Sequence, residues 1–373
     1  MSKNILPTNL ILPEINMNMK LNIDKVTAKK LTMNNFRSEV LVNEGSVFFK
    51  NLRANYFNSS IKANAKYSKS NKKKNIVVIG SGPAGMESAR ILGERGHEVT
   101  VLEKEKDIGG TLRVASLAYE PNQALITYLK NSLKHLGIKI KTRTKANLEV
   151  LKKISPDHVL FATGAKRNAP QIPGKELGHV FDGEELKSLL ISSNSEAEKK
   201  LNILSRLILR AGNLSQLLRN ISTLRILSKF WMPLKKELVI IGGDLVGLEL
   251  AEFLTERGKK VTVVEPSNDL GPNLSIVRRS RVIHLLKSHG VNIIKNAKDI
   301  KISNSDVNFE LDGSPQSITA NQVIIAMGTE PNTEFADELI ENNFNVSMIG
   351  DCTSVGYIEG AISDARIAVK EII

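Results

Sequence analysis

The sequence predicts an α/β fold made of two Rossmann-like dinucleotide-binding domains, preceded by a small β-rich N-terminal segment. Residues 75–103 and 237–265 each run from an apolar strand through a glycine-rich turn and a helix to a second strand that ends at a glutamate. This order of elements is that of a dinucleotide-binding βαβ unit. Residues 19–67 instead alternate apolar and polar side chains with a period of two, which indicates strands.

The first glycine turn follows the apolar strand at 75–79 and opens a helix. Gly80 permits the tight turn, Gly82 lets the backbone approach a pyrophosphate, and Gly85 lets the helix pack closely on the strand. The helix N-terminus offers N–H groups and a positive dipole end to that pyrophosphate. Glu103 lies 23 residues after Gly80, at the tip of the second strand, where a carboxylate can accept the hydroxyl pair of a ribose. The stretch therefore predicts a nucleotide site rather than an ordinary turn.

The same pattern recurs in the second half of the chain. A strand at 237–241 leads into the turn 242–247, a helix follows, and a second strand ends at Glu265, again 23 residues after the first glycine of the turn. Each half also contains a buried strand that ends in a turn of small residues, at 162–164 and 326–328, where the small side chains leave room for a cofactor. Two copies at equal spacing predict two nucleotide sites.

The composition narrows the class of protein. The chain has 373 residues and a single cysteine, Cys352, which excludes a disulfide framework, a redox-active cysteine pair and a cysteine-ligated iron–sulfur cluster. A reducing, cytoplasmic location is therefore expected. No apolar run reaches the length of about 18 residues that a membrane-spanning helix needs. The histidines show no metal-ligand spacing, and we expect neither a metal site nor a catalytic side chain.

The net charge of +13 is concentrated in two segments. Residues 1–75 hold 14 Lys/Arg against 4 Asp/Glu, and residues 187–236 hold 10 against 2, whereas the rest of the chain is mildly acidic. Basic segments of this kind can bind nucleic acid, but no recognition motif accompanies them and aromatic residues are few. We therefore expect no nucleic-acid partner and interpret the charge as contact with some acidic surface.

The segment 186–236 interrupts the α/β pattern with two expected helices. An apolar stripe on the second helix comprises Leu214, Leu217, Leu218, Ile221, Leu224, Leu227 and Trp231. Arg219, Arg225 and Lys229 lie off that stripe, as in a helix that rests on an anionic membrane. We favour packing of the stripe on the core or on a partner domain, with the basic face in solvent, over contact with a membrane surface.

The N-terminal segment is expected to form a β-meander whose apolar face it cannot cover by itself. A turn at 43–46 separates two of its strands, and a lysine-rich linker at 68–74 follows the last one. The stretch 21–67 resembles one repeat of the AsmA-type envelope proteins, whose β-repeats line lipid-carrying grooves. The matching features are Leu21-Asn22-Ile23-Asp24, Leu31-Thr32, Gly45 and Leu52-Arg53-Ala54-Asn55-Tyr56.

Residues 74–373 resemble the two-dinucleotide-fold flavoproteins related to disulfide reductases, here without the cysteine pair of those enzymes. They are most similar to the C-terminal half of bacterial NADH:flavin oxidoreductases of the 2,4-dienoyl-CoA reductase and 2-enoate reductase type. The motifs that carry the resemblance are Val78-Ile79-Gly80-Ser81-Gly82-Pro83-Ala84-Gly85, Gly109-Gly110-Thr111-Leu112, Ala162-Thr163-Gly164, Ile241-Gly242-Gly243 and Gly350-Asp351-Cys352. The resemblance implies that the first turn holds FAD and that the second turn, in a domain inserted into the FAD-binding domain, holds NAD(P)H.

This reading divides the chain into a β-rich segment (1–67), a basic linker (68–74), the first part of an FAD-binding domain (75–185), a basic helical insert (186–236), an NAD(P)-binding domain (237–330) and the C-terminal part of the FAD-binding domain (331–373). The expected cofactor-binding residues are Gly80, Ser81, Gly82, Pro83, Ala84, Gly85, Glu103, Lys104, Gly110, Thr111, Leu112, Ala162, Thr163, Gly164, Gly242, Gly243, Asp244, Leu245, Val246, Gly247, Glu265, Gly328, Gly350 and Asp351. The resemblance places Asp351 beside the ribityl and phosphate groups of the flavin.

Two departures from the family pattern bear on function. The region before Lys74 is too short for the substrate-reducing barrel of these enzymes and has no cysteine for their iron–sulfur cluster, so we expect the electron-input half, with an acceptor protein or domain supplied in trans. Asp244 stands where the family usually has glycine, and a carboxylate beside a pyrophosphate weakens binding by about a kcal/mol or more. Glu265 matches a free 2′-hydroxyl and repels a 2′-phosphate, so NADH is expected rather than NADPH.

Three functions are compatible with these observations. In the first, NADH reduces FAD and the electrons pass to a separate acceptor of the enoate or dienoyl reductase type. In the second, Asp244 has closed the second site, and the chain binds flavin or nucleotide with little turnover. In the third, the N-terminal segment leads an envelope lipid-handling protein. A yellow protein that NADH bleaches would support the first, and a yellow protein that NADH does not bleach would support the second. A colourless protein that extracts lipid would support the third.

Overall fold

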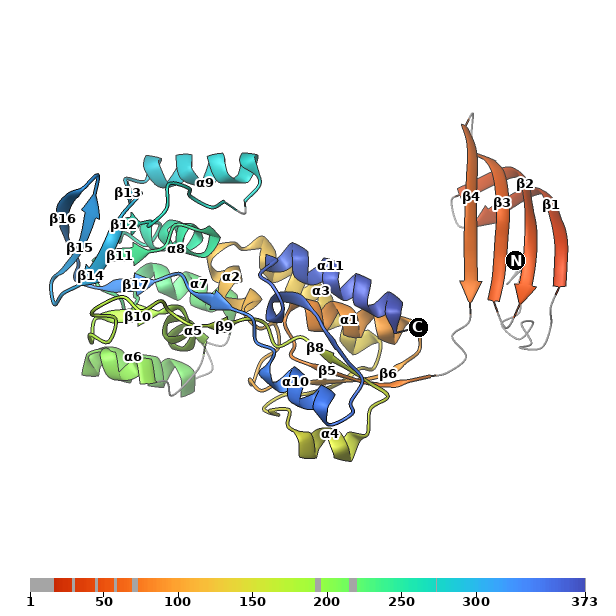
Figure 1. Ribbon diagram of the computed structural model, residues 1–373, viewed down its shortest axis with the longest axis horizontal. Helices are drawn as coiled ribbons and strands as arrows, with labels where there is room; N and C mark the ends of the chain where they lie inside the picture. The colour runs from red at the N-terminus through yellow and green to blue at the C-terminus, as the bar shows by residue number, and fades with distance from the viewer. Residues whose placement is uncertain are drawn as a thin grey trace. The chain divides into compact units, whose positions relative to one another are not determined.

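The computed structural model describes residues 17–28, 31–43, 46–56, 59–68, 73–191, 196–214, 220–272 and 274–372. The chain divides into two compact units, Met1–Lys73 and Lys74–Ile373. The first unit is drawn in red and orange-red in Figure 1, and the second runs from orange to blue.

The first unit is a four-stranded antiparallel sheet whose strands follow one another in sequence order. Its strands are β1 (Met17–Ala28), β2 (Leu31–Asn43), β3 (Ser46–Tyr56) and β4 (Ser59–Ser68). The register places Met19 opposite Val40 and Ile23 opposite Phe36, so apolar side chains lie across from one another. Val40 is buried, but Met19 and Ile23 each keep 36% of their surface exposed. The expected β-meander is confirmed. Residues 44 and 45 of its expected turn lie outside the described residues.

The second unit begins with a parallel sheet of strand order β19-β8-β5-β6-β7. These strands are β5 (Asn75–Ile79), β6 (Glu98–Leu102), β7 (Lys139–Lys141), β8 (His158–Phe161) and β19 (Val346–Met348). Side chains on both faces of β5 are buried, because helices cover the sheet on both sides. Helices α1 (Pro83–Glu94), α3 (Pro121–His135) and α11 (Tyr357–Glu371) cover one face, and α4 (Leu148–Ile154) and α10 (Glu334–Glu341) cover the other (Figure 1).

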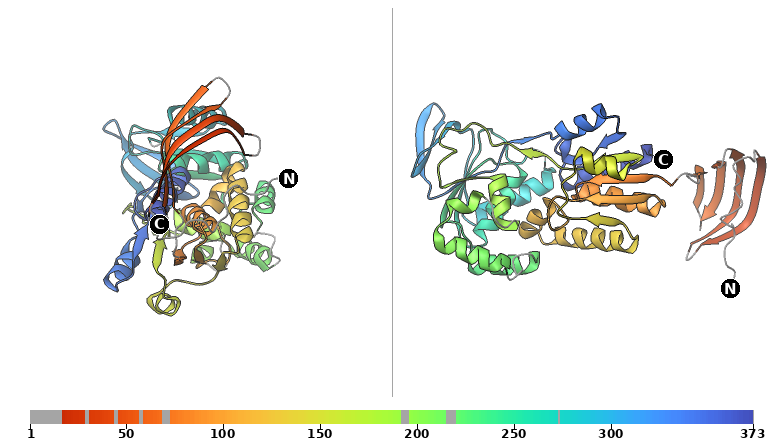
Figure 2. Two further views of the ribbon diagram at one scale, coloured as in Figure 1. Left: turned by 90° about the vertical axis from the view of Figure 1, so that its right-hand side faces the viewer. Right: turned by 90° about the horizontal axis from the view of Figure 1, so that it is seen from below.

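A second parallel sheet in the same unit has the strand order β10-β17-β11-β12-β13. Its strands are β10 (Val180–Asp182), β11 (Glu237–Ile241), β12 (Lys260–Val264), β13 (Asn292–Ile294) and β17 (Val323–Ile325). Helices α8 (Leu245–Thr255) and α9 (Ile276–Ser288) pack on one face. The antiparallel strands β14 (Lys298–Ile302), β15 (Asp306–Leu311) and β16 (Ser314–Thr319) pack on the other (Figure 1; Figure 2). The α/β fold with two dinucleotide-binding domains is therefore confirmed.

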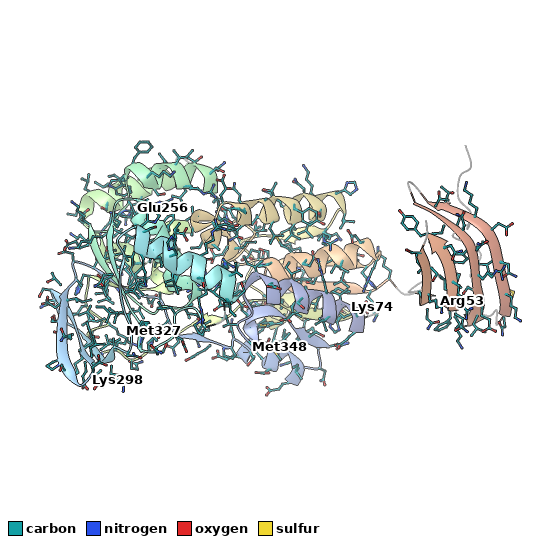
Figure 3. The ribbon with its side chains drawn as sticks, turned by 90° about the horizontal axis from the view of Figure 1, so that it is seen from above. Arg53, Lys74, Glu256, Lys298, Met327 and Met348 are labelled. Atoms are coloured by element: carbon teal, nitrogen blue, oxygen red, sulfur yellow. The ribbon has the colours of Figure 1, made fainter. Side chains whose placement is uncertain are left out.

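The chain crosses between the two sheets twice, and the two crossings pair with each other. Strand β9 (Lys166–Arg167) lies antiparallel to β18 (Thr329–Glu330). Met327, two residues after β17, and Met348, the last residue of β19, lie near the ends of the two different sheets (Figure 3). Because β10 belongs to the second sheet, the chain has left the first sheet before residue 180. Strand β10 thus precedes the domain boundary expected at residue 185, and a three-residue strand carries too short a pattern to be predicted from the sequence.

The insert between β10 and β11 contains more helices than the expected pair. Its elements are α5 (Gly183–Ile191), the 3₁₀-helix η1 (Glu196–Lys200), α6 (Ile203–Leu214) and α7 (Ile221–Phe230). The expectation of one stripe from Leu214 to Trp231 is wrong, because Leu214 belongs to α6 and a new helix begins at Ile221. The side chain of Asn220 accepts hydrogen bonds from the N–H groups of Ser222 and Thr223 and so caps that new helix. Residues 217–219 lie outside the described residues.

The orientation of α7 also differs from the expectation. Its buried side holds Leu224 and packs against α2 (Leu112–Ala118), as expected of an apolar stripe. Arg225, however, points inward: it donates to the Ser116 carbonyl and lies 3.2 Å from a carboxylate oxygen of Glu120. Phe230 keeps 84% of its surface exposed. The division into an apolar inner face and a basic outer face is therefore wrong for this helix. Among the described residues, no helix combines the length and hydropathy needed to cross a membrane.

Candidate nucleotide-binding sites

The first glycine turn has the geometry of a phosphate cradle. Gly80 has φ +99°, and a Cβ there would lie 2.4 Å from the Ala162 carbonyl oxygen. A Cβ on Gly85 would lie 2.0 Å from the Gly80 carbonyl oxygen, so strand and helix touch through their backbones. At Gly82, by contrast, no atom lies within 4 Å of the Cβ position. Gly80 and Gly85 are therefore needed by the fold, whereas Gly82 faces open space in front of the α1 N-terminus.

The acid at the end of β6 is bonded to this turn. Glu103 is buried, and its Oε2 accepts the Ser81 N–H at 2.9 Å as well as the Ser81 hydroxyl. Its Oε1 accepts the Glu105 N–H at 2.8 Å. Oε2 thus accepts two hydrogen bonds, whereas Oε1 has a further lone pair that a ribose hydroxyl can use. Lys104, the next residue, is exposed.

Two further segments lie at the N-terminus of α1. The Gly109 N–H donates to the Ser81 carbonyl at 2.9 Å, and a Cβ on Gly110 would lie 3.2 Å from Gly82 Cα. A Cβ on Gly350 would lie 3.0 Å from the Cβ of Ala84. Two segments that are distant in sequence thus meet around Gly82. They bring with them Thr111 and Leu112, which follow Gly110, and Asp351, which follows Gly350.

The carboxyl end of β8 completes the first site. Ala162 continues the sheet by donating its N–H to the Ile79 carbonyl at 2.9 Å, and Thr163 and Gly164 follow. Asn332 donates from its side chain to the Thr163 hydroxyl at 3.2 Å and from its backbone to the Cys352 carbonyl at 2.8 Å. Asn332 was not predicted from the sequence. The one available signal is its position four residues after the small-residue turn at 326–328.

Asp351 lies in this region and is partly buried. Burial raises the pKa of its carboxyl, against the effect of the backbone N–H groups of Gly356 and Tyr357, which donate to it. The Gly356 N–H lies 3.0 Å from Asp351 Oδ1. Asp351 therefore binds the segment that leads into α11.

The second turn repeats the first in its details. Gly242 has φ +115°, and a Cβ on Gly247 would lie 1.9 Å from the Gly242 carbonyl oxygen. Glu265 accepts the Gly243 N–H at 2.6 Å, as Glu103 accepts the Ser81 N–H. The Gly271 N–H donates to the Gly243 carbonyl at 2.8 Å, which repeats the bond from Gly109 to Ser81. Gly271 lies six residues after Glu265, as Gly109 lies six after Glu103. An alignment of residues 75–110 with residues 237–271 therefore indicates Gly271 as the counterpart of Gly109.

One position of the second turn breaks the repeat. Asp244 corresponds to Gly82 and is the N-cap residue of α8, followed by the buried Leu245 and the exposed Val246. Asp244 Oδ2 accepts a hydrogen bond of 2.8 Å from the Tyr357 hydroxyl, on the first residue of α11. Tyr357 was missed, because 113 residues separate it from Asp244.

Gly328 was also expected at the second site, but the structure shows it where two backbone segments pack closely together. It has φ +86°, and a Cβ there would lie 2.0 Å from the Asn168 carbonyl oxygen. It therefore lets the second crossing between the sheets pack against the first.

The buried Cys352 is expected to be unreactive. Burial raises the pKa of its thiol to about 11. Because the thiolate is the reactive form, we predict that Ellman's reagent labels the native protein near neutral pH about 100-fold more slowly than the urea-unfolded protein. Equal labelling rates would contradict this placement.

The comparisons with known proteins agree with this geometry. The family model "Pyridine nucleotide-disulphide oxidoreductase" matches residues 45–150 and 74–371. Bilirubin reductase of Mediterraneibacter gnavus is 31% identical over 305 residues, which cover 81% of this chain and 41% of that protein. NADH oxidase of Thermoanaerobacter brockii is 29% identical over 297 residues, covering 78% and 40%.

Among solved structures, 2-naphthoyl-CoA reductase in complex with 2-naphthoyl-CoA matches with a TM-score of 0.64 and 27% identity. The match covers 79% of this chain and 39% of that one. An NAD-dependent persulfide reductase of A. fulgidus, 21% identical with a TM-score of 0.52, shows the fold alone. The chain thus spans about two fifths of the length of the curated relatives quoted. It belongs to the pyridine nucleotide-disulphide oxidoreductase family, a family of NAD(P)H-dependent flavin oxidoreductases.

Proposed function

We propose that this chain is an electron-input module that binds FAD at the first glycine turn and NADH at the second. The observation that carries the proposal is the repeated turn. In both copies, the residue after the first glycine donates its N–H to the acid at the end of the next strand, and a glycine loop bonds back to that residue. With both nucleotides bound, the chemistry supplied is hydride transfer from nicotinamide to flavin.

The protein's part in that chemistry is binding and orientation. The N–H groups that begin α1 and α8 would bind the two pyrophosphates. Glu103 and Glu265 would accept ribose hydroxyls while keeping their backbone hydrogen bonds. Gly82 leaves space for the first pyrophosphate, whereas Asp244 places a carboxylate beside the second. The residues of the first turn therefore fit FAD. The residues of the second turn fit NADH when the Asp244 carboxylate points away from the pyrophosphate position.

The electron acceptor is proposed to be a separate protein or domain of the enoate or dienoyl reductase type. Cinnamate reductase of Clostridium sporogenes, 27% identical, and the 2-naphthoyl-CoA reductase structure support an acceptor with a carbon–carbon double bond. The chain covers 39% of each of these proteins. The single cysteine supports the proposed cytoplasmic location.

The test is an anaerobic titration of the purified protein with NADH while the visible absorption band of the flavin is followed. We expect a yellow protein that NADH bleaches with one equivalent. A yellow protein that NADH leaves unbleached would favour the alternative of a flavin-binding protein with little turnover. A protein that contains no flavin and does not take up added FAD would overturn the proposal.

Glu265 is proposed to select NADH over NADPH, and this gives a second prediction. A carboxylate at the ribose would repel a 2′-phosphate, while glutamine keeps an oxygen for the Gly243 N–H. Glu265→Gln should lower the ratio of kcat/KM for NADH to that for NADPH about 10-fold, mainly through KM. An unchanged ratio would show that Glu265 does not contact the ribose.

The likeness of the first unit to an AsmA-type repeat remains a prediction. The observation that favours it is the exposure of Met19, Ile23 and Ile61 on the sheet β1–β4, at 36–39% each. Extraction of fluorescent phospholipid from vesicles by the full chain would support it. Equal extraction by the full chain and by a variant with Met19 and Ile23 changed to serine would contradict it.

A further inference from the structure

We propose that Tyr357 is a positioning residue for NADH: its hydroxyl keeps the Asp244 carboxylate off the N–H groups that begin α8, so that these groups stay available to a pyrophosphate. The inference rests on the proposed function, in which NADH binds the second turn. It concerns a contact between a residue of the NADH-binding fold and a helix of the FAD-binding fold.

The first observation is that Asp244 does not cap its own helix. It is the N-cap residue of α8, with φ −82° and ψ −177°, yet its side chain makes no cap hydrogen bond. An aspartate in this position usually accepts the N–H of the second or third helical residue, here Val246 or Gly247. Asn147 and Asn220 do cap their helices α4 and α7 in this way. Some other contact must therefore hold the Asp244 side chain in its orientation.

The second observation identifies that contact. Asp244 Oδ2 accepts the Tyr357 hydroxyl at 2.8 Å. Tyr357 is itself fixed from the other side, because the backbone N–H groups of Gly356 and Tyr357 donate to the Asp351 carboxylate. Its φ of +57° is unusual for an aromatic residue, and so the surrounding structure must impose its conformation. A continuous set of hydrogen bonds thus runs from Asp351 near the first turn to Asp244 in the second.

The consequence follows from the two competing positions of the carboxylate. If the Tyr357 hydroxyl is removed, the Asp244 carboxylate loses that neutral donor and can accept the N–H groups of Val246 and Gly247. Those are the groups that a pyrophosphate would use. The carboxylate would then both occupy the phosphate position and repel the phosphate charge. The first turn has no such competitor, because its corresponding residue is Gly82.

The test compares wild type, Tyr357→Phe, Asp244→Gly and the double variant. The dissociation constant for ADP-ribose is measured by calorimetry, which requires no flavin turnover, and KM for NADH is measured in parallel. Tyr357→Phe should raise both constants about 5- to 30-fold, with kcat at saturating NADH and the FAD content unchanged. In the Asp244→Gly background, Tyr357→Phe should change neither constant. The matched control is Tyr128→Phe, which removes the hydroxyl of a tyrosine that is 54% exposed on α3 and should leave both constants unchanged.

Each contrary outcome has a distinct meaning. Tighter binding by Tyr357→Phe would show that Tyr357 closes the second turn, which would overturn the proposal. Equal effects of Tyr357→Phe with and without Asp244 would show that it does not act through Asp244, which would also overturn it. Failure of every variant to bind ADP-ribose, Asp244→Gly included, would overturn the proposed function together with this inference.

Discussion

Gly82→Val is expected to leave the fold intact and to abolish FAD binding. No atom lies within 4 Å of the Cβ position at Gly82, and its φ of −68° and ψ of −176° suit any residue. The second turn supplies direct support, because Asp244 carries a side chain there at nearly the same angles. The open space is where the backbone must approach the pyrophosphate. A branched side chain should therefore lower FAD affinity by at least about 100-fold through lost amide contacts and steric exclusion.

The measurement is the FAD content of the purified variant and its uptake of added FAD, together with the thermal unfolding midpoint of the apoprotein. The matched control is Gly178→Val, because Gly178 also has open space at its Cβ and no positive φ, but lies away from both turns. We expect the control to keep its flavin. A Gly82→Val protein with one FAD per chain would remove the first turn from the cofactor site.

The parts of the fold that the sequence predicted depend on short-range patterns. The strands at 75–79, 98–102, 237–241 and 260–264 have the bounds that were expected, because each is an apolar run of β-branched residues closed by a glycine or a glutamate. The turn glycines could be predicted for the same reason, because the backbone conformation that requires a glycine is set by residues a few positions away.

The parts that were missed depend on long-range contacts. Nothing near Tyr357 in the sequence indicates that its hydroxyl meets Asp244, and the pairing of β10 with β17 joins residues more than 140 positions apart. The inward orientation of Arg225 on α7 was missed for a related reason. A helical stripe shows which residues share a face, but the neighbouring element decides which face is covered, and here α2 binds Arg225 through the Ser116 carbonyl.

Gly247→Ala is expected to abolish reduction by NADH while FAD stays bound. A Cβ at this position would lie 1.9 Å from the Gly242 carbonyl oxygen, and backbone atoms cannot give way as a flexible side chain can. We expect the N-terminus of α8 to be displaced from β11, at a cost of about 3 kcal/mol or more of stability in the second domain. The first sheet has its own core, formed with α1, α3 and α11, and should keep its flavin.

The matched control uses the same substitution in a helix with free space. Gly360 lies inside α11 with no atom within 4 Å of its Cβ position, so Gly360→Ala should raise stability by about 0.5 to 1 kcal/mol. Flavin absorbance, ADP-ribose calorimetry and thermal unfolding of both variants separate the two sites. If Gly247→Ala released FAD while ADP-ribose still bound, the two nucleotides would have to be exchanged between the turns. If Gly247→Ala changed neither FAD binding nor ADP-ribose binding, the close contact between Gly247 and Gly242 would be absent in solution.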